Sequence, residues 1–179
     1  KNLYFRSKKD TLELSHFNLN SQINGTNKII TVDVPDYMRA TLDGRFNVTE
    51  IANVVNNSLV NLVPSFRHKK VSPNQSFAFD VYVQQNLLKY IDSSIQIEPE
   101  TRIKGFIDGN KNQLEANLDT PGIKYAGIQL FQSKVNLNTI AEVPTLNAKI
   151  DSLKVSGVTL NALNINSIPK NDTLIVVTD

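Results

Sequence analysis

Apolar and polar residues alternate along most of this chain, most regularly in its second half. Leu114, Ala116 and Leu118 alternate with Glu115, Asn117 and Asp119. A period of two is typical of a β-strand with one apolar and one polar face. The same period recurs in several later runs, at residues 146–150, 153–155, 158–160, 163–165 and 174–176. Short strands joined by short turns predict an antiparallel meander, in which neighbours in sequence are neighbours in space.

Two segments in the first half have helical spacing instead. Asn47 can cap a helix, and Glu50 stands three residues later, as in a capping box. The spacing predicts a helix over residues 48–63, ended by Pro64, with asparagines on its polar side and an apolar stripe that packs against the sheet. The stripe consists of Ile51, Val54, Val55, Leu59 and Leu62. A second, shorter helix is predicted over residues 84–91.

The turns between the predicted strands carry few chemical signals. Asn24 and Gly25 favour a hairpin, because both accept a positive φ. Asp108, Asn110 and Asn112 share the first spacings of a calcium-binding loop, but Gln113 stands where that loop requires glycine. We therefore interpret this run as a hairpin turn.

The sequence carries no signature of catalysis. The two histidines, His16 and His68, are isolated, and neither has another histidine or an acidic residue at the spacing of metal ligands. The sequence has no nucleophile elbow and no phosphate-binding glycine loop. We expect neither an enzyme nor a cofactor or metal site.

Composition narrows the class of protein further. The chain has 179 residues, a formal net charge of +2 from 19 basic and 17 acidic residues, and no cysteine. Disulfide scaffolds and cysteine-ligated zinc are excluded. The dispersed charge argues against nucleic-acid binding. The densest basic run, residues 67–70, is interpreted as a solvated loop, with contact to lipid headgroups as the alternative.

The apolar face of a long meander must be covered by a helix, by a second sheet or by a bound apolar molecule. Both predicted helices lie in the first half, so the later strands need another cover. One answer is a sheet curled into an open groove, and the other is a closed sandwich. The residues that would line a groove, or else form an ordinary core, are Phe77, Phe79, Val81, Leu114, Leu118, Ile128, Leu130, Leu146 and Ile150.

Several segments resemble those of a known family. The run Leu42-Asp43-Gly44-Arg45-Phe46 and the capped helix that follows are similar to segments of the AsmA-like proteins, especially the TamB translocation and assembly module proteins of Bacteroidetes-type bacteria. Residues 103–130, with Gly105, Asp108-Gly109 and Tyr125-Ala126-Gly127, and residues 153–165 resemble the β-repeats of the same proteins.

This resemblance implies a piece of a longer, repetitive envelope protein in the periplasm of a Gram-negative bacterium, with a membrane anchor outside these residues. Its sheet would form a taco-like open groove that conducts phospholipid or assists outer-membrane protein assembly. Residues 1–179 are then one mainly β domain with two helices, acting without catalysis on lipid and on outer-membrane assembly proteins. The alternative is a β-sandwich that binds a protein or a glycan.

Overall fold

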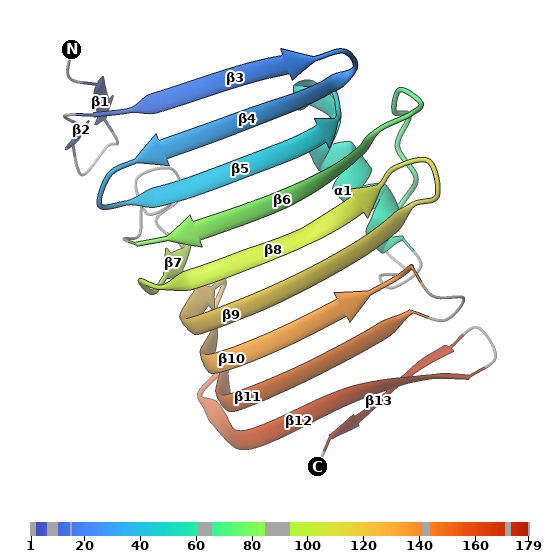
Figure 1. Cartoon of the computed structure of the whole chain (residues 1–179). Coiled ribbons are helices and arrows are strands. Elements are labelled where there is room, and N and C mark those ends of the chain that lie inside the picture. The colour runs from blue at the N-terminus through green and yellow to red at the C-terminus, as the bar shows by residue number, and fades with distance from the viewer. Residues whose placement is uncertain are drawn as a thin grey trace.

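The chain folds into one long, open, antiparallel β-sheet with a helix behind it (Figure 1). The computed structural model describes residues 3–6, 11–14, 16–60, 66–84, 94–140, 144–170 and 173–178. In this part of the chain, no helix is long and apolar enough to cross a membrane.

The main sheet has 11 strands, and ten of them form a continuous path from β13 to β3. Every pairing is antiparallel, and β7 joins at the side by pairing with β9. The strands of the path are β3 (Asn18–Asn24), β4 (Asn27–Val34), β5 (Met38–Arg45), β6 (Ser76–Val83), β8 (Thr101–Asp108), β9 (Gln113–Tyr125), β10 (Ile128–Asn138), β11 (Thr145–Val155), β12 (Val158–Lys170) and β13 (Thr173–Thr178). β7 is Gln96–Ile97, and β1 (Leu3–Arg6) and β2 (Thr11–Leu14) form a separate pair.

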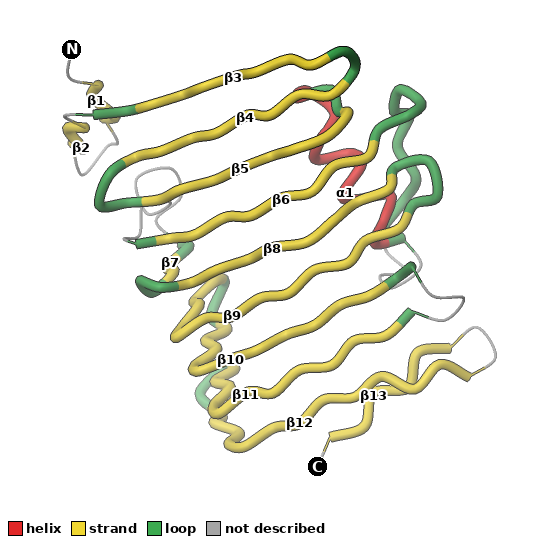
Figure 2. The backbone as a smooth tube through the Cα atoms, viewed as in Figure 1, coloured by secondary structure: helices red, strands yellow, loops and turns green. Residues whose placement is uncertain are grey.

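The predicted mainly β meander is therefore confirmed. Each strand of the path pairs with its neighbour in sequence, except that β6 pairs with β8 across the short β7. The strands of the path lie in a single layer, rather than in the two packed layers of a sandwich (Figure 2). The predicted hairpin at Asn24 and Gly25 joins β3 to β4, with Gly25 at a φ of 61°.

The first predicted helix is present but begins differently from the prediction. A 3₁₀ turn (Val48–Glu50) leads into α1 (Ile51–Leu59). The Asn47 side chain accepts a hydrogen bond from the Thr49 N–H at 3.3 Å, as a cap should. Residues 61–63, the end of the predicted helix, lie outside the described residues, as does the second predicted helix apart from Gln84.

Glu50 does not complete a capping box. Its carboxylate instead accepts hydrogen bonds from the Ser72 N–H at 2.8 Å and from the Gln75 side chain at 2.7 Å. The hydrogen bond from the Ser72 backbone is the main cause that lowers the pKa of the Glu50 carboxyl. In the predicted capping box the Asn47 N–H would donate a hydrogen bond to the Glu50 side chain. It donates instead to Gln75 Oε1 at 2.8 Å. Gln75, which is remote in sequence, thus accepts the hydrogen bond of the N-cap residue's N–H.

The main core lies between α1 and the middle of the sheet. Val54 of α1 is fully buried against Phe77 of β6, Ile107 of β8 and Leu114 of β9. Phe46, just before the helix, adds a ring 5.3 Å from that of Phe77. The predicted apolar stripe of the helix packs on the sheet through Ile51, Val54, Val55 and Leu59, while Leu62, its last member, lies outside the described residues.

The register sorts the strands' side chains onto two faces. Directly paired residues point to the same side of a sheet, so Phe77, Ile107 and Leu114 mark one face across three strands. We call the side that carries these residues and α1 the apolar face. The other side, the polar face, carries residues such as Asp80, Lys104 and Asn117, which are also paired in register.

A bend crosses the sheet near one end of the strands. Pro121, Gln132, Asp151 and Ala162 fall in the one-residue gaps that interrupt the pairing of β9 to β12, and together they form one line, which we call the crease. Gln132 and Ala162 of this line have φ values of 43° and 56°, which extended strands do not have, and Glu100, just before β8, has one of 65°. Beyond this line the ends of β9 to β12 leave the plane of the sheet (Figures 1 and 2).

The alternation of apolar residues shifts by one position at the crease in each of these four strands. Before the crease the apolar positions include Leu118, Val135, Ile150 and Leu163, and beyond it they include Ile123, Leu130, Leu153 and Leu160. Just before the crease, Thr120 and Ser133 on the apolar face are each 1% exposed. Burial of such small side chains is expected on the inner side of a bend, so the bend closes toward the apolar face.

The turn between β8 and β9 matches the hairpin interpretation. The Asp108 carboxylate accepts hydrogen bonds from the backbone N–H of Asn110 at 3.0 Å and of Lys111 at 3.3 Å. Asn110 Oδ1 accepts one from the Asn74 N–H at 2.6 Å. These side chains hold loops together.

Candidate functional site

Most of the predicted groove-lining residues share the apolar face. Phe77 and Leu114 lie beneath α1 in the core, Ile150 is buried near the crease, and the other members of this group are half-buried. The register places seven of the predicted residues on this face: Phe77, Phe79, Val81, Leu114, Leu118, Leu146 and Ile150. Ile128 and Leu130 lie beyond the crease, where Ile128 is 44% exposed.

One line of the apolar face is apolar across eight consecutive strands of the path. We call it the apolar row. Neighbouring members are directly paired, and each keeps part of its surface accessible, with Ile103 the most exposed at 36%. The row consists of Val32, Ala40, Val81, Ile103, Leu118, Val135, Ala148 and Ile165. The core contacts of α1 centre instead on the line that contains Phe77, Ile107 and Leu114, which is two lines away on the same face.

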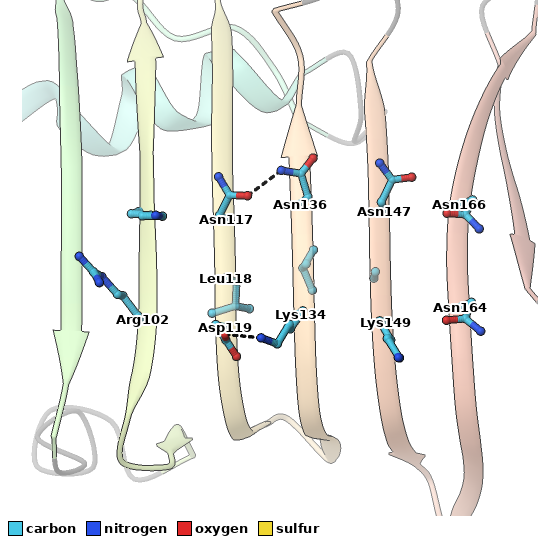
Figure 3. Close-up of a pocket in the computed structure, with 13 residues that line it drawn as sticks. Arg102, Asn117, Leu118, Asp119, Lys134, Asn136, Asn147, Lys149, Asn164 and Asn166 are labelled. Carbon is cyan, nitrogen blue, oxygen red and sulfur yellow. Dashed lines mark hydrogen bonds and ion pairs between the residues drawn. The ribbon is translucent and has the colours of Figure 1, made fainter.

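The polar face carries a hollow of about 800 Å³ over β8 to β12 (Figure 3). We call it the polar hollow. Its polar side chains come from two adjacent lines of the register, and the apolar residues at its floor belong to the apolar row on the opposite side. It is lined by Arg102, Lys104, Asn117, Leu118, Asp119, Lys134, Val135, Asn136, Asn147, Ala148, Lys149, Asn164 and Asn166.

Four asparagines form the first line of the polar hollow. Asn117, Asn136, Asn147 and Asn166 are paired in register across β9 to β12. Asn136 donates from its side-chain amide to Asn117 Oδ1 at 2.6 Å. Asn147 and Asn166 are exposed. An amide both donates and accepts hydrogen bonds, so this line offers both functions to a ligand.

Charged side chains form the second line. Arg102, Asp119, Lys134 and Lys149 are paired in register across β8 to β11. Lys134 forms an ion pair with Asp119 at 2.9 Å. Arg102 forms a two-pronged ion pair with Asp80, whose Nε–Oδ1 bond measures 2.9 Å. The Arg102 guanidinium thereby lowers the pKa of the Asp80 carboxyl.

Two lysines of this line face each other directly. Lys134 and Lys149 are cross-strand partners, and like charges in that position destabilise a sheet. Asp119 neutralises Lys134, and within the described residues no ion pair is formed by Lys149. Four cationic side chains and one carboxylate line the hollow in all. The site therefore has a surplus of positive charge.

Among the described residues, no group of three or more histidine, aspartate or glutamate side chains could hold a metal ion. His16 and His68 are exposed residues of irregular segments. The exposed basic run at residues 67–70 is held through its backbone, since the Asn57 amide bonds both the N–H and the carbonyl of Lys69. The expectation of a loop in this place is confirmed.

Sequence reasoning missed the polar hollow. The signal was available, because Asn147 and Lys149 alternate with Leu146, Ala148 and Ile150 in β11. Such positions were interpreted as a solvated face, and the pattern of one strand does not say which polar residues of other strands stand beside them. Only the register brings four asparagines into one line.

The fold and its two surfaces define the class as a single-layer antiparallel β-sheet protein with a covering helix. No family model, no curated protein and no solved structure matches the chain.

Proposed function

We propose that the apolar face of this sheet binds acyl chains of phospholipid, and that the chain is a non-enzymatic module of a bacterial cell envelope. The observation that carries this proposal is the apolar row, which crosses eight strands without a polar residue and keeps part of its surface accessible. The resemblance to AsmA-like proteins supports the periplasmic setting and suggests outer-membrane assembly proteins as further partners.

The dimensions of the row support an acyl ligand. Eight strands have seven gaps, and at ~4.8 Å between strands the row is roughly 34 Å long. The hydrocarbon core of a bilayer, which holds two acyl chains end to end, is ~30 Å thick. Covering apolar surface stabilises a complex by ~25 cal/mol per Å², so ~100 Å² contributes about 2.5 kcal/mol without any specific polar contact.

The bend at the crease supports an open groove. The sheet closes there toward the apolar face, so the ends of β9 to β12 form a wall beside the apolar row. Ile128 and Leu130, predicted as lining residues, belong to that wall. In this proposal the floor and the wall together make the trough, and α1 closes one side of it.

A photoreactive side chain tests the proposal. We expect benzoylphenylalanine in place of Ile103, in protein made in a Gram-negative periplasm, to form phospholipid adducts visible by mass spectrometry. Lys104 is the matched control, because it is the next residue of β8, is equally on the surface, and points to the polar face. Adducts at position 104 as abundant as those at 103, or adducts at neither position, would refute lipid binding on the apolar face.

A further inference from the structure

We propose that the polar hollow binds an acidic oligosaccharide, on the side of the sheet opposite to the apolar row. Its volume of about 800 Å³ falls within the range of roughly 300–1,000 Å³ that is usual for ligand pockets. The proposal rests on the charge and on the hydrogen-bonding groups of its lining, taken in turn below.

The surplus of positive charge in the polar hollow favours an anionic ligand. Lys134 and Lys149 face each other across β10 and β11, and Asp119 neutralises the first of them. Lys104 of β8 pairs in register with Asn117, at the end of the asparagine line, and adds another cation. A bound carboxylate or sulfate would offset the repulsion between the two lysines and accept charge-assisted hydrogen bonds from Lys149. Clefts lined by one sign of charge also concentrate ligands of the opposite sign.

The line of four asparagines suits a ligand that carries many hydroxyl groups, such as a sugar chain. Each sugar hydroxyl both donates and accepts, and so does each asparagine amide. Asn136 and Asn117 bond to each other and are thereby held in place, whereas Asn147 and Asn166 are exposed beside Lys149 and Asn164. A sugar chain that runs across the strands would meet an amide at every step, ~4.8 Å apart.

The lining disfavours two other polyanions. Single-stranded nucleic acids are held by cations together with aromatic rings on which the bases stack. None of the residues that line the hollow is aromatic. An acidic peptide offers carboxylates, but it has few hydroxyl groups to bind the line of four asparagines. The chemistry therefore fits acidic sugar units best, such as uronates.

Calorimetric titration with an oligogalacturonate hexasaccharide tests this site. We expect the wild-type chain to bind it, with little or no binding of neutral maltohexaose. Lys149→Gln should weaken binding about tenfold, the effect of losing one charge-assisted hydrogen bond. Lys154→Gln is the matched control, because Lys154 is an exposed lysine of the same strand that does not line the hollow. It should change the affinity less than about twofold.

Several outcomes would overturn the proposal. They are the absence of oligogalacturonate binding, equal binding of maltohexaose, equal losses for the two lysine variants, and tighter binding of a polyuridine RNA or a polyglutamate peptide. The thermal midpoint of the free Lys149→Gln chain should stay equal or rise, since the substitution removes a like-charge pair. Its loss of binding then cannot be ascribed to unfolding, and lipid adducts at position 103 should be unaffected.

Discussion

At the scale of single residues, Asn57 shows how a polar position can be structural. The helical pattern placed it on the solvent side of α1, yet it is only 5% exposed. Its amide donates to the Lys69 carbonyl at 2.8 Å and accepts from the Lys69 N–H at 2.7 Å. The Asn57 amide thus makes, with Lys69, the pair of hydrogen bonds that a neighbouring strand would make in a sheet. A helical wheel cannot show them, because the partner lies 12 residues away in an irregular segment.

Asn57→Ala should lower the free energy of unfolding by about 2 kcal/mol, because it removes two part-buried hydrogen bonds and leaves the Lys69 N–H and carbonyl without their partner. Urea denaturation monitored by circular dichroism measures this change. Asn56→Ala is the matched control. Asn56 donates an exposed hydrogen bond to the Arg67 carbonyl at 2.7 Å and a long one to Asn57 Oδ1 at 3.5 Å, so its loss should be below about 1 kcal/mol. Equal losses for the two variants would contradict the role given to Asn57.

At the scale of elements, glycines and phenylalanines in neighbouring strands fit together. Gly44 in β5 lies opposite Phe77, and Gly105 in β8 lies opposite Phe79. A Cβ at Gly105 would stand 2.7 Å from Phe79 Cζ and 2.0 Å from the Glu115 carbonyl oxygen. Gly44 and Gly105 thus have the same structural role, because each gives room to a phenylalanine of β6, which lies between β5 and β8.

Gly105→Ala should destabilise the chain by about 3 kcal/mol, since overpacking of this kind forces neighbouring strands apart. Chemical denaturation again gives the measurement. Gly157→Ala serves for comparison, because a Cβ there meets nothing within 4 Å and only the φ of +86° resists it. That strain amounts to about 1 kcal/mol. A Gly105→Ala chain that loses no more stability than Gly157→Ala would show that the close approach is unimportant.

Sequence pattern predicted these elements well where a single local rule decides the structure. Alternation located most strands, Asn24-Gly25 located a hairpin, and the spacing of Val54 and its neighbours located α1. The capping box failed at Glu50, because Ser72 and Gln75 compete for its carboxylate through tertiary contacts. The polar hollow could not be predicted, since it depends on register between strands that are far apart in the sequence.

At the scale of the whole molecule, the crease gives the sheet its shape. A one-residue shift of the apolar alternation occurs in four strands at aligned positions, so the bend is encoded in the sequence although each shift alone resembles noise. Gln132 and Ala162 adopt positive φ there, a conformation that costs a residue other than glycine about 1 kcal/mol or more.

Ala162→Gly should therefore raise the free energy of unfolding by up to about 1 kcal/mol, because glycine adopts positive φ without strain. Ala148→Gly is the natural contrast, because Ala148 belongs to the apolar row in the interior of β11, where glycine should cost about 1 kcal/mol. Opposite signs for the two variants in urea titrations support a built-in bend. Destabilisation by both would mean that the backbone at Ala162 is not strained.

The order of strand pairing has a consequence for how the chain folds and comes apart. Nearly all partners are consecutive in sequence, and apart from the connections between β5 and β6 and between β6 and β8 the loops are short, so that most contacts are local and favour rapid folding. Strands can join one at a time on either side of a folding nucleus in which α1 packs against β8 and β9. Amide hydrogens should accordingly exchange slowest in these central strands and progressively faster toward β3 and β13, so that the molecule unzips from its margins inward.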